Sequence, residues 1–207
     1  GDILWGSVNG GANWVNITSA VSGTAVNWSG ANLVDGGSIA FKVSDLAGNH
    51  SPTLATQAYV LDTSAPTQTI SGVRLSNDTS ANEQSNTDFV TSKASQTITA
   101  TLSATLLVSD ILYGSVDNGN TWVDITAQVN GTRISWADVT LSPGTHTISF
   151  KVVDLAGNTG SVTGVQTYTL DTQPPATRIA SAAFSDSTDG FSMNTAVQDL
   201  SGSLSAS

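Results

Sequence analysis

Apolar and polar residues alternate with a period of two along most of the chain, which is the pattern of half-buried β-strands. Between residues 64 and 172 the alternating runs are separated by turns rich in Gly, Asn, Asp and Ser. They predict seven short strands, at about 69–75, 96–102, 111–116, 121–125, 132–136, 147–153 and 162–170. Seven strands in a segment of this length are typical of two packed antiparallel sheets, so the expected fold class is an all-β sandwich without helices.

The same alternation predicts which side chains face inward. In this segment they are Ile98, Leu102, Ile111, Tyr113, Trp122, Ile134, Trp136, Ile148, Phe150, Val152, Tyr168 and Leu170. Nearer the N-terminus, Trp14, Trp28, Phe41, Tyr59 and Leu61 repeat the pattern. Large aromatic residues on alternating strands fill the space between two sheets, so we expect a core role for them rather than ligand stacking. Lys42 and Lys151 each follow a core Phe and should point outward.

The chain is a tandem array. The stretch that begins at Asp110 repeats the one at Asp2, an offset of 110 − 2 = 108, and Asp171 repeats Asp62, an offset of 171 − 62 = 109. A third copy begins near Pro174. The predicted parts are therefore the end of a first module (residues 1–63, the head), a complete module (64–172, the middle module) and the start of a third (173–207, the tail).

Composition narrows the range of partners. The formal charge is −10 with six Lys and Arg residues, which disfavours binding to nucleic acid or to anionic membrane surfaces and favours cations. The chain has no run of about 18 apolar residues, so we expect no insertion of this segment into a membrane. There is no Cys, which excludes disulfides and thiolate chemistry.

The sequence contains few residues that could act as a catalytic acid, base or nucleophile, and we expect that the protein is not an enzyme. His50 and His146 lie at non-equivalent positions of the two copies, and Glu83 is the one Glu. Residues 115–122 are similar to the Asp-box of sialidases, but Asn9 replaces the acid of Asp117 in the first copy. A tight turn in which Gly and Asn take positive φ explains both versions.

The order of several short motifs carries a resemblance to a known family. The motifs are at residues 87–91, 101–104, 115–122, 153–158 and 170–175. Together they resemble the bacterial immunoglobulin-like repeats of giant biofilm-associated and RTX-type surface adhesins. The resemblance implies tandem immunoglobulin-like Greek-key sandwiches, located extracellularly on the bacterial cell surface, which act as non-enzymatic extenders and bind Ca²⁺ at their junctions.

Calcium is the one chemistry that the residues favour, because Asp-rich loops supply the oxygen ligands of hard cations. Strands that alternate in direction divide the candidate ligands between two poles of the middle module. At the proximal pole, where the linker from the head arrives, are Asp62, Asp110, Asp154 and Asn158. At the distal pole are Asp78, Asp88, Asp117 and Asp171. The competing interpretation of each Asp is a hydrogen bond to its own turn.

Two functions from different classes follow. The first is a stalk segment of a surface adhesin that supports cell adhesion and biofilm formation, with neighbouring immunoglobulin-like repeats as partners and Ca²⁺ stiffening the junctions. The alternative is a carbohydrate- or ice-binding module, or an accessory domain of a secreted glycoside hydrolase, which would expose aromatic residues. Because head and tail are incomplete modules, we also expect the tail of one chain to complete the head of another copy by strand complementation.

Overall fold

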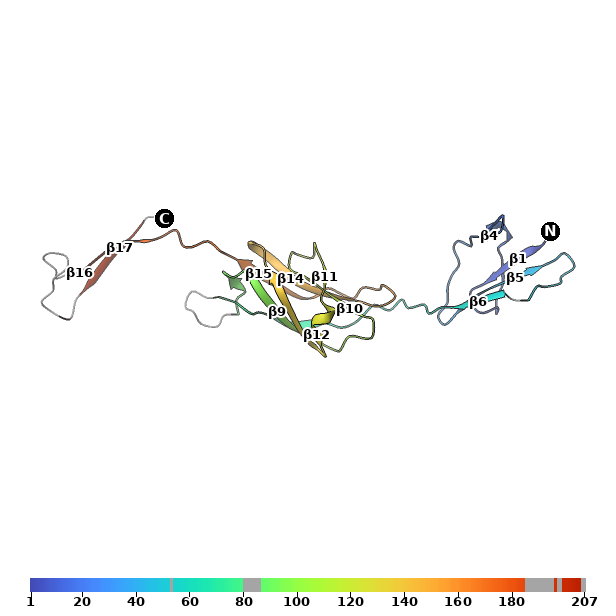
Figure 1. The fold of residues 1–207 in the computed structure, drawn as a ribbon, viewed down its shortest axis with the longest axis horizontal. Coiled ribbons are helices and arrows are strands. Elements are labelled where there is room, and N and C mark those ends of the chain that lie inside the picture. The colour runs from blue at the N-terminus through green and yellow to red at the C-terminus, as the bar shows by residue number, and fades with distance from the viewer. Residues whose placement is uncertain (53, 80–86, 185–195, 197–198, 206–207) are drawn as a thin grey trace.

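The structure is a computed structural model that describes residues 1–52, 54–79, 87–184, 196 and 199–205. It is all-β, as predicted, and its strands form three groups that follow one another along the chain (Figure 1). Within the described residues the helical segments are two single 3₁₀ turns, η1 (Thr18–Ala20) and η2 (Thr126–Gln128). None of the described helices has the length and apolar character needed to cross a membrane.

The middle module consists of two sheets. The first has the order β11 (Val123–Asp124), β10 (Ile111–Ser115), β14 (Gly144–Val153), β15 (Thr163–Leu170) and β8 (Val90–Thr91). The second has the order β12 (Val129–Asn130), β13 (Arg133–Thr140), β9 (Ser95–Leu102) and β7 (Ile70–Leu75). All pairs are antiparallel except β8 with β15. One buried cluster contains residues of both sheets, which makes the module sandwich-like.

The strand pattern was predicted in outline, with differences at three short elements. Strand β11 has two residues where five were expected, because the chain turns into η2 directly afterwards. The short strands β8 and β12 were not predicted, since a two-residue strand carries no detectable alternation. Strand β13 continues to Thr140, past a β-bulge between Trp136 and Val139 where Asp138 has a φ of 58°.

The core of the middle module contains most of the expected side chains. Ile98, Ile134, Ile148 and Phe150 are completely buried. The ring of Trp136 meets the ring of Phe150 edge to face, with 6.2 Å between their centroids. These contacts join the two sheets, because β14 belongs to the first sheet and β9 and β13 belong to the second.

The prediction of which β10 side chains face the core was wrong. Ile111 and Tyr113 are partly exposed, whereas Leu112 between them is completely buried. The physical reason is Gly114, on the same side of the strand as Leu112. A Cβ at this position would lie 2.6 Å from Cζ3 of Trp136, so the indole occupies the space that the glycine leaves open.

Trp122 and Trp14 were also wrongly assigned to the core. The Nζ of Lys151 lies 4.3 Å from the ring centroid of Trp122 and 5.7 Å from that of Tyr113. In the head, the Nζ of Lys42 lies 4.4 Å from the ring centroid of Trp14. Lys151 lies between the buried Phe150 and Val152 of β14, so it points outward, as predicted, and the rings of Trp122 and Tyr113 lie with it on the outer face of the first sheet. Trp14 lies beside Lys42 in the same way on the sheet of the head.

The head reproduces part of the middle module. Its sheet has the order β2 (Val15–Asn16), β1 (Ile3–Ser7), β5 (Ser38–Ser44) and β6 (Leu54–Ala58), which corresponds to β11-β10-β14-β15. A separate hairpin of β3 (Val21–Ser22) and β4 (Ala25–Val26) corresponds to β12 and β13. Trp28, Phe41, Tyr59 and Leu61, expected in the core, are only partly buried.

The described part of the tail is one antiparallel hairpin of β16 (Ile179–Phe184) and β17 (Leu200–Leu204). Ile179 pairs with Leu204 in this hairpin, just as Ile70 pairs with Leu102 between β7 and β9 of the middle module. The tail hairpin is therefore the counterpart of β7 and β9.

Candidate functional site

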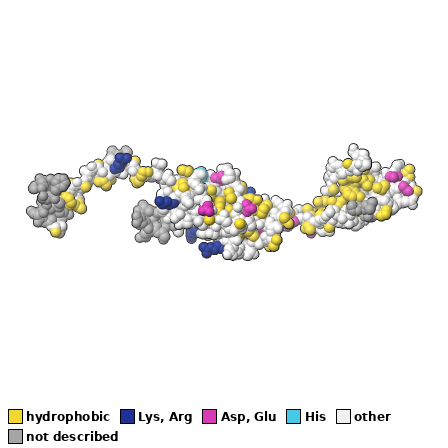
Figure 2. Space-filling model, in the orientation of Figure 1, with side chains coloured by type: hydrophobic (Ala, Val, Ile, Leu, Met, Phe, Trp, Pro, Cys, Tyr) yellow, Lys and Arg dark blue, Asp and Glu magenta, His cyan; other side chains and the backbone are white. Residues whose placement is uncertain are grey.

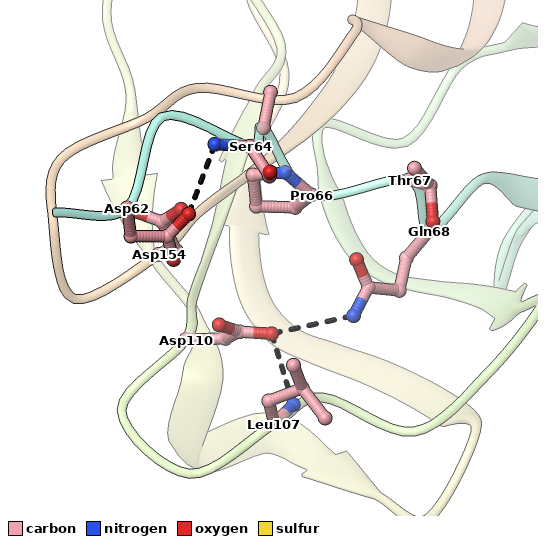
Figure 3. A pocket seen from close by; sticks show the side chains of 9 residues that line it. Asp62, Ser64, Pro66, Thr67, Gln68, Leu107, Asp110 and Asp154 are labelled. Carbon is pink, nitrogen blue, oxygen red and sulfur yellow. Dashed lines mark hydrogen bonds between the residues drawn. The ribbon is translucent and has the colours of Figure 1, made fainter. Parts of the chain in front are cut away.

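The strongest candidate site lies where the linker from the head reaches the middle module. Three of the predicted carboxylates, those of Asp62, Asp110 and Asp154, line one pocket there (Figure 3). Asn158, the fourth residue predicted for the proximal pole, donates a hydrogen bond from Nδ2 to the backbone oxygen of Asp62, at 3.0 Å. The structure thus brings together the four residues that the alternation of strand direction had placed at this pole.

The loop that holds Asp154 is a self-contained turn. Oδ1 of Asp154 accepts from the backbone N of Asn158 at 2.8 Å, and Oδ2 accepts from Nδ2 of Asn158 at 2.9 Å. The hydrogen bond from the Asn158 side chain is the main reason that the pKa of Asp154 is lowered. Asp45 and Asn49 make the same pair of bonds in the head, at 2.9 and 2.8 Å. The turn is therefore a repeated structural feature that fixes the direction of the carboxylate.

The linker is seated against this loop by close backbone contact. A Cβ at Gly160, which follows the loop, would lie 2.7 Å from the carbonyl oxygen of Pro66. Oδ1 of Asp62 accepts from the backbone N of Ser64 at 2.9 Å, which holds the linker in a turn. Together with the bond between Asn158 and Asp62, these contacts fix where the linker enters the middle module.

Asp110 is the most enclosed of the carboxylates, with 6% of its surface exposed. Its Oδ2 accepts from the backbone N of Leu107 at 2.9 Å and from Nε2 of Gln68 at 3.3 Å. Among the described residues Oε1 of Gln68 is buried and has no hydrogen-bond partner. A buried oxygen of this kind calls for a donor or a cation. Gln68 was missed in the sequence, because an amide just after a proline linker carries no distinctive pattern.

The three carboxylates share the pocket without converging on one point. In the described part of the chain no three side chains of His, Cys, Asp or Glu are grouped closely enough to hold a metal ion. An ion at this pocket would therefore take most of its oxygen ligands from backbone carbonyls, amides and water, all of which Ca²⁺ accepts. The residues that would hold it are Asp62, Asp110 and the amide oxygen of Gln68.

At the distal pole, Asp78 has a structural role of its own. Its Oδ2 accepts from the backbone N of Phe89 at 3.1 Å. Phe89 is buried and has a φ of 63°, a conformation that is strained for a bulky residue. Burial is the main reason that the pKa of Asp78 is raised, and the negative charge of Asp88 raises it further. The hydrogen bond from Phe89 N helps to hold this strained turn.

Asp88 and Asp171 also bond to their own turns. Oδ1 of Asp88 accepts from the backbone N of Val90, and Oδ1 of Asp171 accepts from the backbone N of Gln173, both at 2.9 Å. The backbone N of Asp171 donates to the oxygen of Thr91 at 3.0 Å, so this residue lies beside the end of β8. The loop at 80–86, between Asp78 and Asp88, lies outside the described residues.

Asp117 organises the β10–β11 hairpin. Its Oδ1 accepts from Oγ of Ser115 and from the backbone N of Thr121, at 2.8 and 2.9 Å, and its Oδ2 accepts from Oγ1 of Thr121 at 2.6 Å. These bonds, led by that from the Thr121 side chain, lower the pKa of Asp117 to about 2. Asn118 and Gly119 have φ values of 65° and 79°, which confirms the predicted turn conformation.

The head supplies a natural variant of this hairpin, which leads to a prediction. Asn9 stands at the position of Asp117, and its Oδ1 accepts from Oγ of Ser7 at 3.0 Å and from the backbone N of Asn13 at 2.8 Å. We therefore expect Asp117→Asn to keep the hairpin and to lower the melting temperature at pH 7 by less than Asp117→Ala does.

The pH dependence separates the charge of Asp117 from its hydrogen bonds. Because the folded pKa lies below the unfolded value, the charge stabilises the fold above about pH 4, and this contribution is lost as the pH falls towards 2. Melting temperatures measured between pH 7 and pH 2 should fall more steeply for the wild type than for Asp117→Asn. Parallel curves would contradict the assigned role of the carboxylate.

Comparison with models of known protein families and with curated protein sequences gives no match. The functional interpretation therefore depends on the geometry of the chain itself.

Proposed function

We propose that the chain is a run of non-enzymatic extender repeats from the stalk of a large bacterial cell-surface adhesin. In this proposal the modules are immunoglobulin-like Greek-key sandwiches outside the cell, and they hold an adhesive tip at a distance in support of cell adhesion and biofilm formation. The observation that carries the proposal is the position of the linker, which Asn158 holds through Asp62 and which lies against Gly160 through Pro66. On the other side of this linker, the sheet of the head repeats the order of four strands of the middle module. A repeated fold with fixed joints is suited to building length.

The proposal includes Ca²⁺ at the proximal joint. The carboxylates of Asp62, Asp110 and Asp154 line one pocket, and the buried Oε1 of Gln68 lacks a partner among the described residues. Carboxylates gathered at a short linker repel one another, so a divalent ion would remove the repulsion and restrict the linker. Asp78, Asp88 and Asp171 stay candidates for a second joint, and Asp117 is the weakest, because both of its oxygens are bonded within its hairpin.

Calcium should therefore stabilise and extend the wild-type chain. At a free concentration of about 100 times Kd, binding adds about 2.7 kcal/mol to the stability of the folded state. We expect a higher melting temperature by calorimetry in millimolar calcium than in chelator, and a larger radius of gyration by small-angle scattering. Asp62→Asn should weaken binding at least tenfold in a calcium titration.

Asp2→Asn is the matched control, because it makes the same change of charge at an exposed position before β1, at the end of the head sheet opposite to the one where β6 leads into the linker. It should titrate like the wild type. Identical melting and scattering in calcium and chelator, or equal behaviour of the two variants, would contradict a calcium joint at Asp62.

The outward aromatic residues favour a second candidate, the carbohydrate- or ice-binding module. Tyr113 and Trp122 lie on the outer face with Lys151, and Trp14 with Lys42 repeats part of the arrangement in the head. Exposed rings of this kind stack on sugars. If the stalk proposal is correct, the chain gives no signal on a glycan array. Binding that disappears in Trp122→Ala, but persists in the exposed-site control Val165→Ala, would favour the second candidate instead.

A further inference from the structure

The chain contains three Asn-Gly pairs, which begin at Asn9, Asn118 and Asn130. Such a pair can modify itself, because the backbone nitrogen of the glycine is able to attack Cγ of the asparagine that precedes it. Glycine carries no side chain that hinders this attack. A hydrogen bond that occupies the nitrogen or fixes the asparagine amide opposes the attack, since the bond has to break first. The hydrogen bonds of the folded chain therefore decide which pair can react.

The pair at Asn9 is fixed within the β1–β2 hairpin. Oδ1 of Asn9 accepts a hydrogen bond from the backbone N of Asn13 at 2.8 Å. The atom that would attack, the backbone N of Gly10, donates to the backbone oxygen of Ser38 at 2.9 Å. The amide and the nitrogen of this pair are therefore both engaged elsewhere.

The pair at Asn118 is fixed in a similar way within the β10–β11 hairpin, although Asn118 is exposed. Oδ1 of Asn118 accepts from the backbone N and from Oγ1 of Thr147, at 2.8 and 3.1 Å. The backbone N of Gly119 donates to Oγ of Ser115 at 3.0 Å. Exposure to solvent alone is therefore not what makes a pair reactive.

The pair at Asn130 is free of such bonds. Asn130 ends β12, and Gly131, with a φ of 61°, begins the tight turn to β13; both residues are exposed. Among the described residues, neither the side chain of Asn130 nor the backbone N of Gly131 takes part in a hydrogen bond. A Cβ placed on Gly131 would meet no atom within 4 Å, so the space around the peptide is open to water.

We propose that the peptide between Asn130 and Gly131 is a site of spontaneous deamidation in the folded protein. The backbone N of Gly131 attacks Cγ of Asn130 and forms a bond to it. The bond from Cγ to Nδ2 breaks, and Nδ2 leaves as ammonia with the proton of the glycine N–H. A water molecule then opens the resulting succinimide ring at one or the other carbonyl, which leaves aspartate or isoaspartate at position 130.

Deamidation changes the charge and the backbone at the edge of the second sheet. Either product carries a carboxylate, and Arg133 lies opposite Asn130 in the pairing of β12 with β13, so the new charge is placed beside a guanidinium. Figure 2 shows few charged side chains, scattered over the visible face of the molecule, so one more carboxylate changes the local charge. Isoaspartate also adds a carbon to the main chain, which disturbs a strand of 2 residues at the sheet edge.

The head has no asparagine at the equivalent position. Ser22 and Gly23 stand where the middle module has Asn130 and Gly131, in a hairpin with the same register. Serine has no amide to lose, so the modification distinguishes the middle module from the head. The inference goes beyond the proposed stalk function and depends neither on calcium nor on adhesion.

Peptide mapping by mass spectrometry tests the site in the full chain, aged in mildly alkaline buffer. Asn9 and Asn130 lie in the same tripeptide, Val-Asn-Gly, so the local sequence is matched. In the folded protein Asn130 should convert at least about tenfold faster than Asn9, where hydrogen bonds must break first. In concentrated urea the two should convert at similar rates. Equal rates in the folded protein, or the same ranking in urea, would overturn the proposal.

Ammonia release and isoaspartate content supply the second test. Asn130→Ser introduces the residue that the head carries, and it should remove most of the ammonia that the folded wild type releases. It should also remove most of the isoaspartate, detected by methylation with an isoaspartyl methyltransferase. Asn9→Ser is the matched control, because it makes the same change in the same tripeptide, and it should age like the wild type. Undiminished release from Asn130→Ser, or equal losses in the two variants, would refute the assignment.

Discussion

Replacing Phe150 by Ala should lower the free energy of unfolding of the middle module by about 3–5 kcal/mol. Phe150 is completely buried on β14, and its ring and that of Trp136 meet edge to face across the two sheets. The substitution removes the apolar surface and leaves a cavity that a rigid sandwich closes only in part. Native-state hydrogen exchange of the β14 amides measures the change for this module without a contribution from the head.

Two controls bracket the Phe150 result. Val165→Ala, at a site 60% exposed on β15, should change stability by less than about 0.5 kcal/mol. Phe41→Ala makes the same change on β5 of the head, where the ring is partly exposed, and should cost less than Phe150→Ala because the site already opens to solvent. Equal costs at positions 41 and 150 would contradict the difference in enclosure between head and middle module.

The second large effect is expected from adding a single carbon. Gly114→Ala should destabilise the middle module by about 1–3 kcal/mol, because its Cβ would lie 2.6 Å from the Trp136 ring. The ring cannot simply move away, since it is 6% exposed and packs against Phe150. The same hydrogen-exchange measurement gives the loss.

A double-mutant cycle tests the cause of the Gly114 effect. In a Trp136→Leu background the space under the ring is free, so Gly114→Ala should cost much less than in the wild type. Additive losses would show that the glycine is needed for another reason. The head repeats this arrangement, with the Cβ of a substituted Gly6 placed 2.5 Å from Cζ3 of Trp28.

Much of the fold could be predicted because alternation is strong on the long strands. On β14, Ile148, Phe150 and Val152 alternate with polar neighbours, and all three are buried. On β10 the alternation is ambiguous, because Ile111, Leu112 and Tyr113 are all apolar. The side facing the core is decided by the contact of Gly114 with Trp136, a tertiary packing requirement that the local sequence does not reveal.

The sequence predicts which residues of the candidate site lie near one another, but not the hydrogen bonds that they make. The alternation of strand direction was enough to place Asp62, Asp110 and Asp154 at one pole. It could not show that both carboxylate oxygens of Asp154 accept hydrogen bonds from Asn158, or that a buried oxygen of Gln68 lies at the pocket. These details depend on the path of the linker, which is set by contacts between residues nearly a hundred positions apart.

The contacts that hold the linker against the middle module have a mechanical consequence. A pulling force on the head reaches β7 through residues 62–69. Few contacts hold this segment to the middle module, among them the hydrogen bond from Asn158 to Asp62 and the close approach of Pro66 to Gly160. The strands behind them are held by ladders of hydrogen bonds and a shared core. Under tension the joint should therefore yield first, lengthening the chain by a small step while each sandwich stays folded.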